Sequence, residues 1–352
     1  MGRARNVRAR CVALSGALLL SVGVSAPAVA ASFVSLVDIT DGVGTVTASL
    51  DGGEARQWVT RDGGRTFTRL RVGRELDVYG TVLGNGLGYA RVGSSERLWR
   101  TTNSGRTWTR TGVRDVFRVT ATSTSAWALR SNGRREWLSR SDDGGRTWTT
   151  RELRVRNPEW PAVGVDFADA ADGVLSGLRP SGKPFVRVTQ DGGRTWTGRR
   201  SPCLFSDYKS GPDARWLASG TLWLLCTGPG GTGTEALEVH TSTDAGRTFT
   251  LRSRAPLPGG GGEAVGGLFG VGHIHGFDPV SDRRAFMSFG YGYTVTTDGG
   301  VRWRPLRHLP VQLDGGGSEL KADGRVRYLA LGRHGLWRSP DAGATWRRVK
   351  LR

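Results

Sequence analysis

The chain lacks most of the features that mark a membrane protein, a helical protein or a common enzyme. Its one mostly apolar stretch, 12–24, is shorter than the roughly 20 residues needed to cross a bilayer. No later segment approaches that length, and helical periodicity is missing throughout. The sequence also contains no G-x-S-x-G elbow, no P-loop and no cysteine-rich metal pattern. These absences argue against an integral membrane protein and against several classes of enzyme.

The first thirty residues are predicted to be an export signal that is removed. Four arginines and no acidic residue precede the apolar stretch, and 28–30 is a small-residue cleavage site. We therefore expect one mature domain, 31–352, that is soluble and secreted or otherwise extracytoplasmic. Cys11 lies before the apolar stretch and should leave with the signal.

Cysteine is scarce, with three in the whole chain. After removal of the signal, Cys203 and Cys226 remain. An even pair in an oxidising compartment predicts a disulfide, and two buried thiols are the alternative.

Lysine is nearly absent, so the formal charge of +19 comes mostly from arginine, and it stays at +15 after loss of the four signal arginines. Such a field favours anionic partners, among them nucleic acid, cell-wall polymer and acidic protein surfaces. However, no run of basic residues concentrates the charge. We interpret it mainly as dispersed solubilising charge and expect no nucleic-acid partner, while an anionic protein or envelope polymer stays open.

What the sequence does contain is an eight-residue motif of the form Ser/Thr-x-Asp-x-Gly-x-Thr-Trp, repeated seven times. We call it the box. Its acidic position falls 40 to 54 residues apart, at Asp62, Asn103, Asp143, Asp191, Asp244, Asp298 and Asp341. A repeat of this length with one turn motif per unit is typical of a propeller or solenoid.

Each unit reads as four short strands, which in the first unit are 33–39, 44–50, 56–61 and 67–72. The box is the turn between the third and fourth strands, where paired glycines permit positive φ and the carboxylate accepts backbone N–H groups. Blades of four strands must stack to bury both faces, and radial stacking protects their edges. The prediction is an all-β, monomeric, seven-bladed β-propeller of four-stranded antiparallel blades. We expect Asn103 to accept as the acid does, and Arg302, in place of the box threonine, to cost one turn hydrogen bond.

The box resembles the Asp-box, or BNR repeat, of sialidases, some glucanases, sortilin-type receptors and photosystem II assembly-factor propellers. The resemblance covers the whole mature chain and implies the propeller fold, but the motif recurs across unrelated activities. The segment 165–173, followed by a box, looks most like the assembly-factor group, which implies a non-catalytic scaffold that binds protein.

Longer insertions are expected on the face opposite the boxes, mainly over blades four to six, at 154–164, 178–184, 198–213, 227–235 and 252–267. A Cys203–Cys226 bond would staple this face. The candidate partner-binding residues there are Arg154, Arg156, Trp160, Arg179, Lys183, Arg254, His273 and His275. Trp160 is either an exposed anchor or a side chain clamped against the next blade.

His273 and His275 are predicted on the innermost strand of blade six, near Asp278. Because a metal site needs three or four ligands, we read them as hydrogen-bonded residues lining the central channel, and we predict no metal and no cofactor.

A sialidase would pair an arginine triad with a tyrosine nucleophile and its glutamate. The arginine signature of blade one is absent here, none of the six tyrosines can be assigned a base, and sialidases have six blades. Glucanases of this type resemble two propellers facing each other across a cleft. No catalytic residue is therefore assigned. The sequence favours an exported, non-catalytic scaffold for a protein or cell-envelope glycan, with a secreted sialidase-like glycoside hydrolase as the alternative.

Overall fold

The computed structural model describes residues 33–49, 56–72, 78–93, 96–154, 163–179, 181–204, 211–231, 234–255, 264–268, 274–289, 292–306, 308–310, 318–323, 326–331 and 335–351. Within these ranges the chain forms seven antiparallel sheets of four strands each and no helix. No described segment is therefore a helix that could span a membrane. The predicted fold class is confirmed.

The strands follow one another blade by blade. Blades one to three comprise β1 Phe33–Thr40, β2 Val43–Ser49, β3 Arg56–Thr60, β4 Thr68–Arg69, β5 Val78–Val82, β6 Gly88–Val92, β7 Arg97–Thr101, β8 Thr109–Arg110, β9 Val116–Ala121, β10 Ala126–Ser131, β11 Glu136–Ser141 and β12 Thr149–Glu152. Blades four and five comprise β13 Val163–Phe167, β14 Gly173–Leu178, β15 Pro184–Thr189, β16 Thr197–Arg199, β17 Asp213–Trp216, β18 Leu222–Gly231, β19 Thr234–Ser242 and β20 Thr250–Ala255. Blades six and seven comprise β21 Ile274–Pro279, β22 Ala285–Phe289, β23 Gly292–Thr296, β24 Arg304–Pro305, β25 Ser318–Asp323, β26 Val326–Leu331, β27 Leu336–Ser339 and β28 Arg347–Val349.

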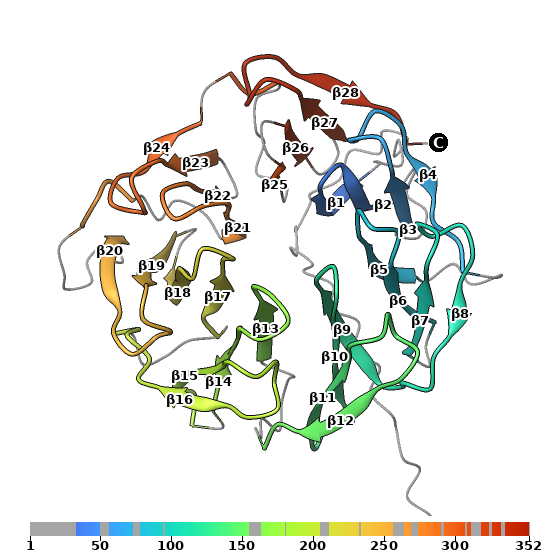
Figure 1. Cartoon of the computed structure of the whole chain (residues 1–352). Helices are drawn as coiled ribbons and strands as arrows, with labels where there is room; N and C mark the ends of the chain where they lie inside the picture. Colours follow the sequence, from blue (N-terminus) through green and yellow to red (C-terminus); the bar gives the residue numbers. More distant parts are fainter. Residues whose placement is uncertain are drawn as a thin grey trace, which may run out of the picture.

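The blades stand around a central axis like the sectors of a ring (Figure 1). The first strand of each blade, from β1 to β25, lies innermost, and the fourth lies at the rim. Seven hydrophobic clusters fill the ring, and each draws its residues from two neighbouring blades. The core is thus a set of seven blade junctions, as expected for sheets that cannot bury both faces alone.

The boxes form the predicted turns. In blade four, Asp191 accepts the backbone N–H of Thr195 at 2.8 Å and its hydroxyl at 2.6 Å. Burial by itself raises the pKa of Asp191, but these hydrogen bonds outweigh it and lower the pKa to about 2.

The two irregular boxes behave as expected. Asn103 Oδ1 accepts the N–H of Thr107 at 2.9 Å. In blade six Asp298 accepts the N–H of Arg302 at 3.0 Å, while the threonine hydroxyl that other boxes contribute at this position is missing.

Backbone hydrogen bonds tie the box to the turn between the first two strands. Gly63 N–H donates to Gly42 O at 2.8 Å, and Gly192 N–H donates to Ala171 O at 2.7 Å. These two kinds of turn therefore share one face of the ring, which we call the box face. The turns between second and third strands, and the connectors between blades, lie toward the opposite face.

Arginine side chains join neighbouring blades at six of the seven junctions. Each donates to the carbonyl of the residue that follows the box acid or asparagine in the next blade. The pairs are Arg61 with Ser104, Arg100 with Gly144, Arg140 with Gly192, Arg199 with Ala245, Arg252 with Gly299, and Arg338 with Gly63. We call these contacts the arginine straps. A guanidinium keeps its charge at all relevant pH values and offers five donors, which suits it to bridging carbonyl groups.

The ring closes without a shared strand, because blade one contains only β1–β4 and blade seven only β25–β28. Closure depends on the Arg338 strap and on a cluster that joins Tyr328 and Leu336 of blade seven to Trp58 and Phe67 of blade one. Two details differ from expectation. The fourth strand of blade one is only Thr68–Arg69, and most of 227–235 extends β18 and β19 as a hairpin rather than forming a loop.

Candidate binding site at the central axis

The innermost strands of blades three to seven carry charged residues toward the axis of the ring. We call those whose side chains the structure describes the axial cluster: Arg118 on β9, Asp166 on β13, Asp213 and Arg215 on β17, Asp278 on β21 and Lys321 on β25. Three are cationic and three anionic, so the cluster is neutral as a whole.

Two of its aspartates cap the exposed edge of the next blade. Asp166 Oδ2 accepts the backbone N–H of Trp216 at 2.9 Å, and Asp278 Oδ2 accepts that of Ala322 at 3.0 Å. An innermost strand has no neighbour on its axial side, so its N–H groups need such acceptors. Asp278 also accepts from Lys321 Nζ at 2.7 Å. These acidic side chains therefore serve the architecture.

Arg215 is likewise occupied. Its two terminal nitrogens face the two oxygens of Asp213 at 3.2 and 3.3 Å, a two-point pair that remains partly exposed. Burial raises the pKa of Asp166, and the nearby Arg215 opposes that rise.

Arg118 is the member whose charge is not matched by contact. Its side chain is exposed, and within the described part of the chain it makes no hydrogen bond and no ion pair. Nη1 lies 3.8 Å from the place where a Cβ on Gly164 would stand, so the guanidinium comes within van der Waals distance of blade four. Although the side chain is open to solvent, the protein that surrounds it partly desolvates the guanidinium and lowers the pKa of Arg118. The neighbouring Arg215 lowers this pKa further, while Asp213 and Asp166 oppose the shift.

The strand register puts Arg118 and Asp213 in line. Arg118 faces Leu129 and Asp213 faces Leu225, each at the fourth position counted from the turn on the box face. Both therefore lie toward the face opposite the boxes, where the sequence had placed binding. A partly desolvated cation at such a place can receive an anionic group of a ligand.

The residues proposed from sequence are not gathered into this site. Arg154, at positive φ, lines a cavity of about 400 Å³ with Gly193 and Arg194 at the junction of blades three and four. Arg179 and Lys183 are exposed in the turn between β14 and β15.

His275 lies exposed on β21, so the predicted placement of His275 on the innermost strand of blade six is confirmed. Arg156, Trp160 and His273 fall outside the described residues.

Arg254 belongs to a buried network in blade five. Its Nε donates to Glu238 Oε1 at 2.9 Å, while Glu238 Oε2 accepts the N–H of Leu204 at 3.1 Å and lies 3.3 Å from His240 Nε2. Burial opposes ionisation of Glu238, but these partners prevail and lower its pKa. Arg254 is thus held by Glu238.

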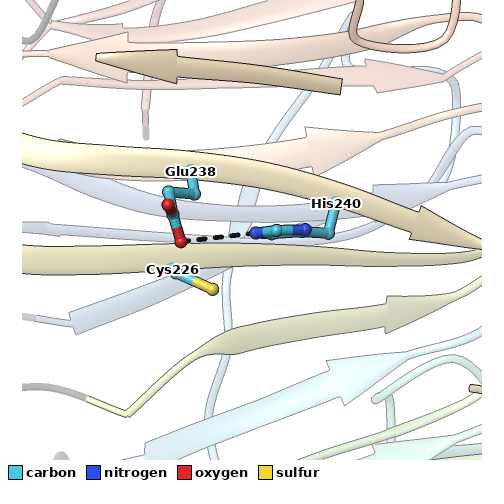
Figure 2. A group of neighbouring side chains, drawn as sticks. All are labelled: Cys226, Glu238 and His240. Atoms are coloured by element: carbon cyan, nitrogen blue, oxygen red, sulfur yellow. Dashed lines mark hydrogen bonds and ion pairs between the residues drawn. The ribbon is translucent and has the colours of Figure 1, made fainter. Parts of the chain in front are cut away.

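Figure 2 shows Glu238 and His240 directed toward each other beside Cys226. One ligand atom from each of the three lies within 4.8 Å of the others. However, Cys226 is joined to Cys203, with an S–S distance of 2.01 Å and a Cα–Cα distance of 5.7 Å. The predicted disulfide is confirmed, and the oxidised protein keeps two of these ligands, fewer than zinc requires.

The axial cluster also differs from a sialidase constellation. Two arginines, Arg118 and Arg215, influence each other electrostatically, and Asp213 and Asp166 act on Arg118 in the opposite sense. Tyr89, Tyr293 and Tyr328 are buried in the clusters between blades.

Sequence reasoning missed Arg118. The available signal was a charged residue in the predicted first strand of a blade, but its lack of a partner depends on blades four and five.

No protein-family model and no curated protein matches the chain. Solved structures do. A structure of YCF48 bound to D1 peptide is 16% identical, with a TM-score of 0.53 over 89% of this chain and 94% of that one. YCF48 from Cyanidioschyzon merolae is also 16% identical, with a TM-score of 0.54 over 87% and 95%. The GH74 xyloglucanase from Xanthomonas campestris is 17% identical, with a TM-score of 0.61 over 89% of this chain and 52% of its own. The chain thus spans about half the length of that enzyme, and at these identities the similarity shows the fold alone.

Proposed function

We propose that this protein is an exported, non-catalytic propeller that binds a protein partner on the face opposite the boxes, with an acidic group of the partner at Arg118. The observation that carries the proposal is the exposed guanidinium of Arg118 on an innermost strand, which makes no hydrogen bond or ion pair among the described residues. YCF48, a chain of nearly the same length as this one, has been solved with a bound D1 peptide, and this supports peptide binding by a single propeller.

The proposed site at Arg118 lies beside the surface over blades four to six that the sequence analysis favoured, one blade away from it. Arg118 belongs to blade three and reaches across blade four toward Asp213 and Arg215 of blade five. A partner would contact the axis there and extend over blades four to six.

The test is an array of random octapeptides, each present with a free and with an amidated C-terminus, probed with the mature protein. We expect bound peptides to carry an acidic side chain or a free carboxylate, and Arg118→Ala to weaken binding about tenfold or more. Arg110→Ala is the matched control, because Arg110 is an exposed arginine on the outer strand β8 and lies over Trp99.

Unchanged binding by the Arg118 variant would contradict the proposal. Selection of peptides without any acidic group would also contradict it. The same holds if the protein binds no peptide and binds only the anionic envelope glycans that are added as competitors.

Glycoside hydrolysis is the second candidate, and one observation favours it. Burial raises the pKa of Asp166, and Asp213 lies close enough to raise it further. Two carboxylates, one of them with a raised pKa, are what most glycosidases use. Against this, Asp166 caps Trp216 and Asp213 pairs with Arg215.

Release assays with sialosides and β-glucans would decide between the two functions. Hydrolysis that disappears in Asp166→Asn would establish the enzyme. We expect none, and in particular no sialoside hydrolysis, because Tyr89, Tyr293 and Tyr328 are buried between blades. The half-buried Tyr79 lies under Arg91 and makes no hydrogen bond to a carboxylate among the described residues.

A further inference from the structure

Among the residues that the structure describes, no arginine strap crosses the junction between blades six and seven, in contrast to the other six junctions. The equivalent acceptor is the carbonyl of Ala342, which follows the box acid Asp341. Within the described chain no arginine donates to it, although Ser104, Gly144, Gly192, Ala245, Gly299 and Gly63 each receive one.

The sequence explains the difference. Strap arginines occupy three kinds of position. Arg100, Arg140 and Arg338 precede the first box residue, Arg61 follows it, and Arg199 and Arg252 lie on the outermost strand. In blade six these positions hold Val295, Thr297 and Leu306. None of the three can donate a guanidinium.

Box seven also lacks the arginine that five other boxes carry within the turn. In box four, Arg194 Nη1 donates to the carbonyl of its own box acid, Asp191, at 2.8 Å. The corresponding residue of box seven is Ala344. The carbonyls of both Asp341 and Ala342 are therefore without a guanidinium partner among the described residues.

A cavity of about 530 Å³ occupies this place. The cavity is open to solvent. Val295, Leu306 and Ala344 line it together with Asp341, Ala342 and the exposed side chains of Arg304 and His308. Its volume lies within the range of small-ligand sites. The apolar walls suit the methylene stem of a long cationic side chain, and the two carbonyls suit its head.

We propose that this cavity binds the guanidinium group of an arginine side chain supplied by a partner protein. The protein's own straps show the geometry. Arg140 Nη1 donates to both Asp191 O and Gly192 O, at 3.0 and 2.8 Å. Arg252 contacts the same two positions with two nitrogens, as Nη2 donates to Asp298 O at 3.2 Å and Nε donates to Gly299 O at 2.7 Å. A partner arginine would meet Asp341 O and Ala342 O in the same way.

The presence of Arg304 in the lining does not prevent this. In box four, Arg140 and Arg194 both donate to the carbonyl of Asp191, so two guanidinium groups share one acceptor. The site should prefer arginine over lysine, because a planar guanidinium can contact two carbonyls at once and is more weakly hydrated than an ammonium.

This site is separate from the one proposed at Arg118. It lies beside box seven, at the junction of blades six and seven, whereas Arg118 belongs to β9, the innermost strand of blade three (Figure 1). Loss of Arg118 should leave it unchanged, so failure of either proposal does not decide the other.

The test is an amide NMR titration of the ¹⁵N-labelled mature protein with N-acetyl-arginine amide, and in parallel with N-acetyl-lysine amide. We expect saturable shifts at Ala342, Gly343 and Ala344 with the arginine compound and at least tenfold weaker binding of the lysine compound. The same peaks should respond to a short arginine-containing peptide.

Val295→Arg restores the missing strap from within and should abolish the response, while Val295→Leu, the matched control, should keep it. Leu306→Arg fills the cavity from the outermost strand and serves if Val295→Arg does not fold. Equal binding of lysine, shifts spread over all seven boxes, or an unchanged response in the strap-restoring variant would overturn the proposal.

Discussion

Ring closure can be tested at Gly64, the second glycine of the first box. It adopts φ +73°, and a Cβ placed there would overlap the ring of Tyr328 in blade seven. Tyr328 is fully buried in the cluster that joins blade seven to blade one. Because no strand is shared across this junction, the contact contributes directly to closure.

Gly64→Ala should carry two costs. The left-handed backbone conformation disfavours alanine by roughly 1 to 2 kcal/mol. Displacing a buried aromatic ring from a packed junction adds about 1 to 3 kcal/mol. The sum is about 2 to 5 kcal/mol, which corresponds to a fall in Tm of roughly 3 to 7 °C for a chain of this size.

Gly182→Ala separates the two costs. Gly182 has a similar φ of +75°, but nothing lies within 4 Å of its added Cβ. It should lower the Tm by only about 2 °C. Calorimetry on both variants, with hydrogen exchange of the β1 and β26 amides, would show whether the additional loss arises at the closing junction. Equal losses for the two variants would refute the role of Tyr328 in closure.

Three further variants test other parts of the chain. Asp191→Ala should cost about 1 to 3 kcal/mol at pH 7, since the turn loses its acceptor. The pKa of Asp191 is about 2 in the folded protein, so the stability that its carboxylate contributes is present above the unfolded pKa and is lost as the pH falls toward 2. Asp191→Asn, which resembles the natural Asn103, should lower the free energy of unfolding by less than Asp191→Ala. Burial raises the pKa of Glu136 to about 7 in the folded protein, so the stability of the fold falls as the pH rises through about 7 and the carboxyl group ionises. Glu136→Gln should therefore stabilise the protein by about 1 to 2 kcal/mol in urea unfolding at pH 8 and hardly at all at pH 5. Replacing Cys203 and Cys226 with serine opens a loop with a sequence separation of 23 and should cost about 3 kcal/mol, and an unchanged urea midpoint would contradict this.

The fold was predictable because its main signal is local. The turn in which Asp191 accepts the N–H of Thr195 spans only five residues, so its hydrogen bonds are encoded in consecutive letters. Seven such turns at blade spacing then define the number of blades. The disulfide was predictable for a different reason, since Cys203 and Cys226 were the two cysteines left after the expected signal.

The sites were less predictable, because they depend on residues from different blades. The surroundings of Arg118 depend on blade four, where Gly164 lies about 46 positions along the chain, and on Asp213 of blade five, which already pairs with Arg215. Arg254 illustrates the converse. Its position in an insertion favoured binding, but Glu238, 16 residues earlier, holds it. No sequence-local pattern distinguishes these two arginines.

Because the blades repeat one pattern, a position in one blade can be compared with the equivalent position in the others. Asp166 and Asp278 show what an axial side chain does when it serves only architecture, namely to cap the N–H of the next blade. Arg118 cannot do this, because a guanidinium has no acceptor to offer. In the same way six straps show what a box carbonyl normally receives, and the carbonyl of Ala342 receives none among the described residues. A departure from the repeat leaves a charge or an acceptor that the fold itself does not satisfy. Ligand binding is therefore best sought at Arg118 and beside Ala342, where the repeated pattern is interrupted.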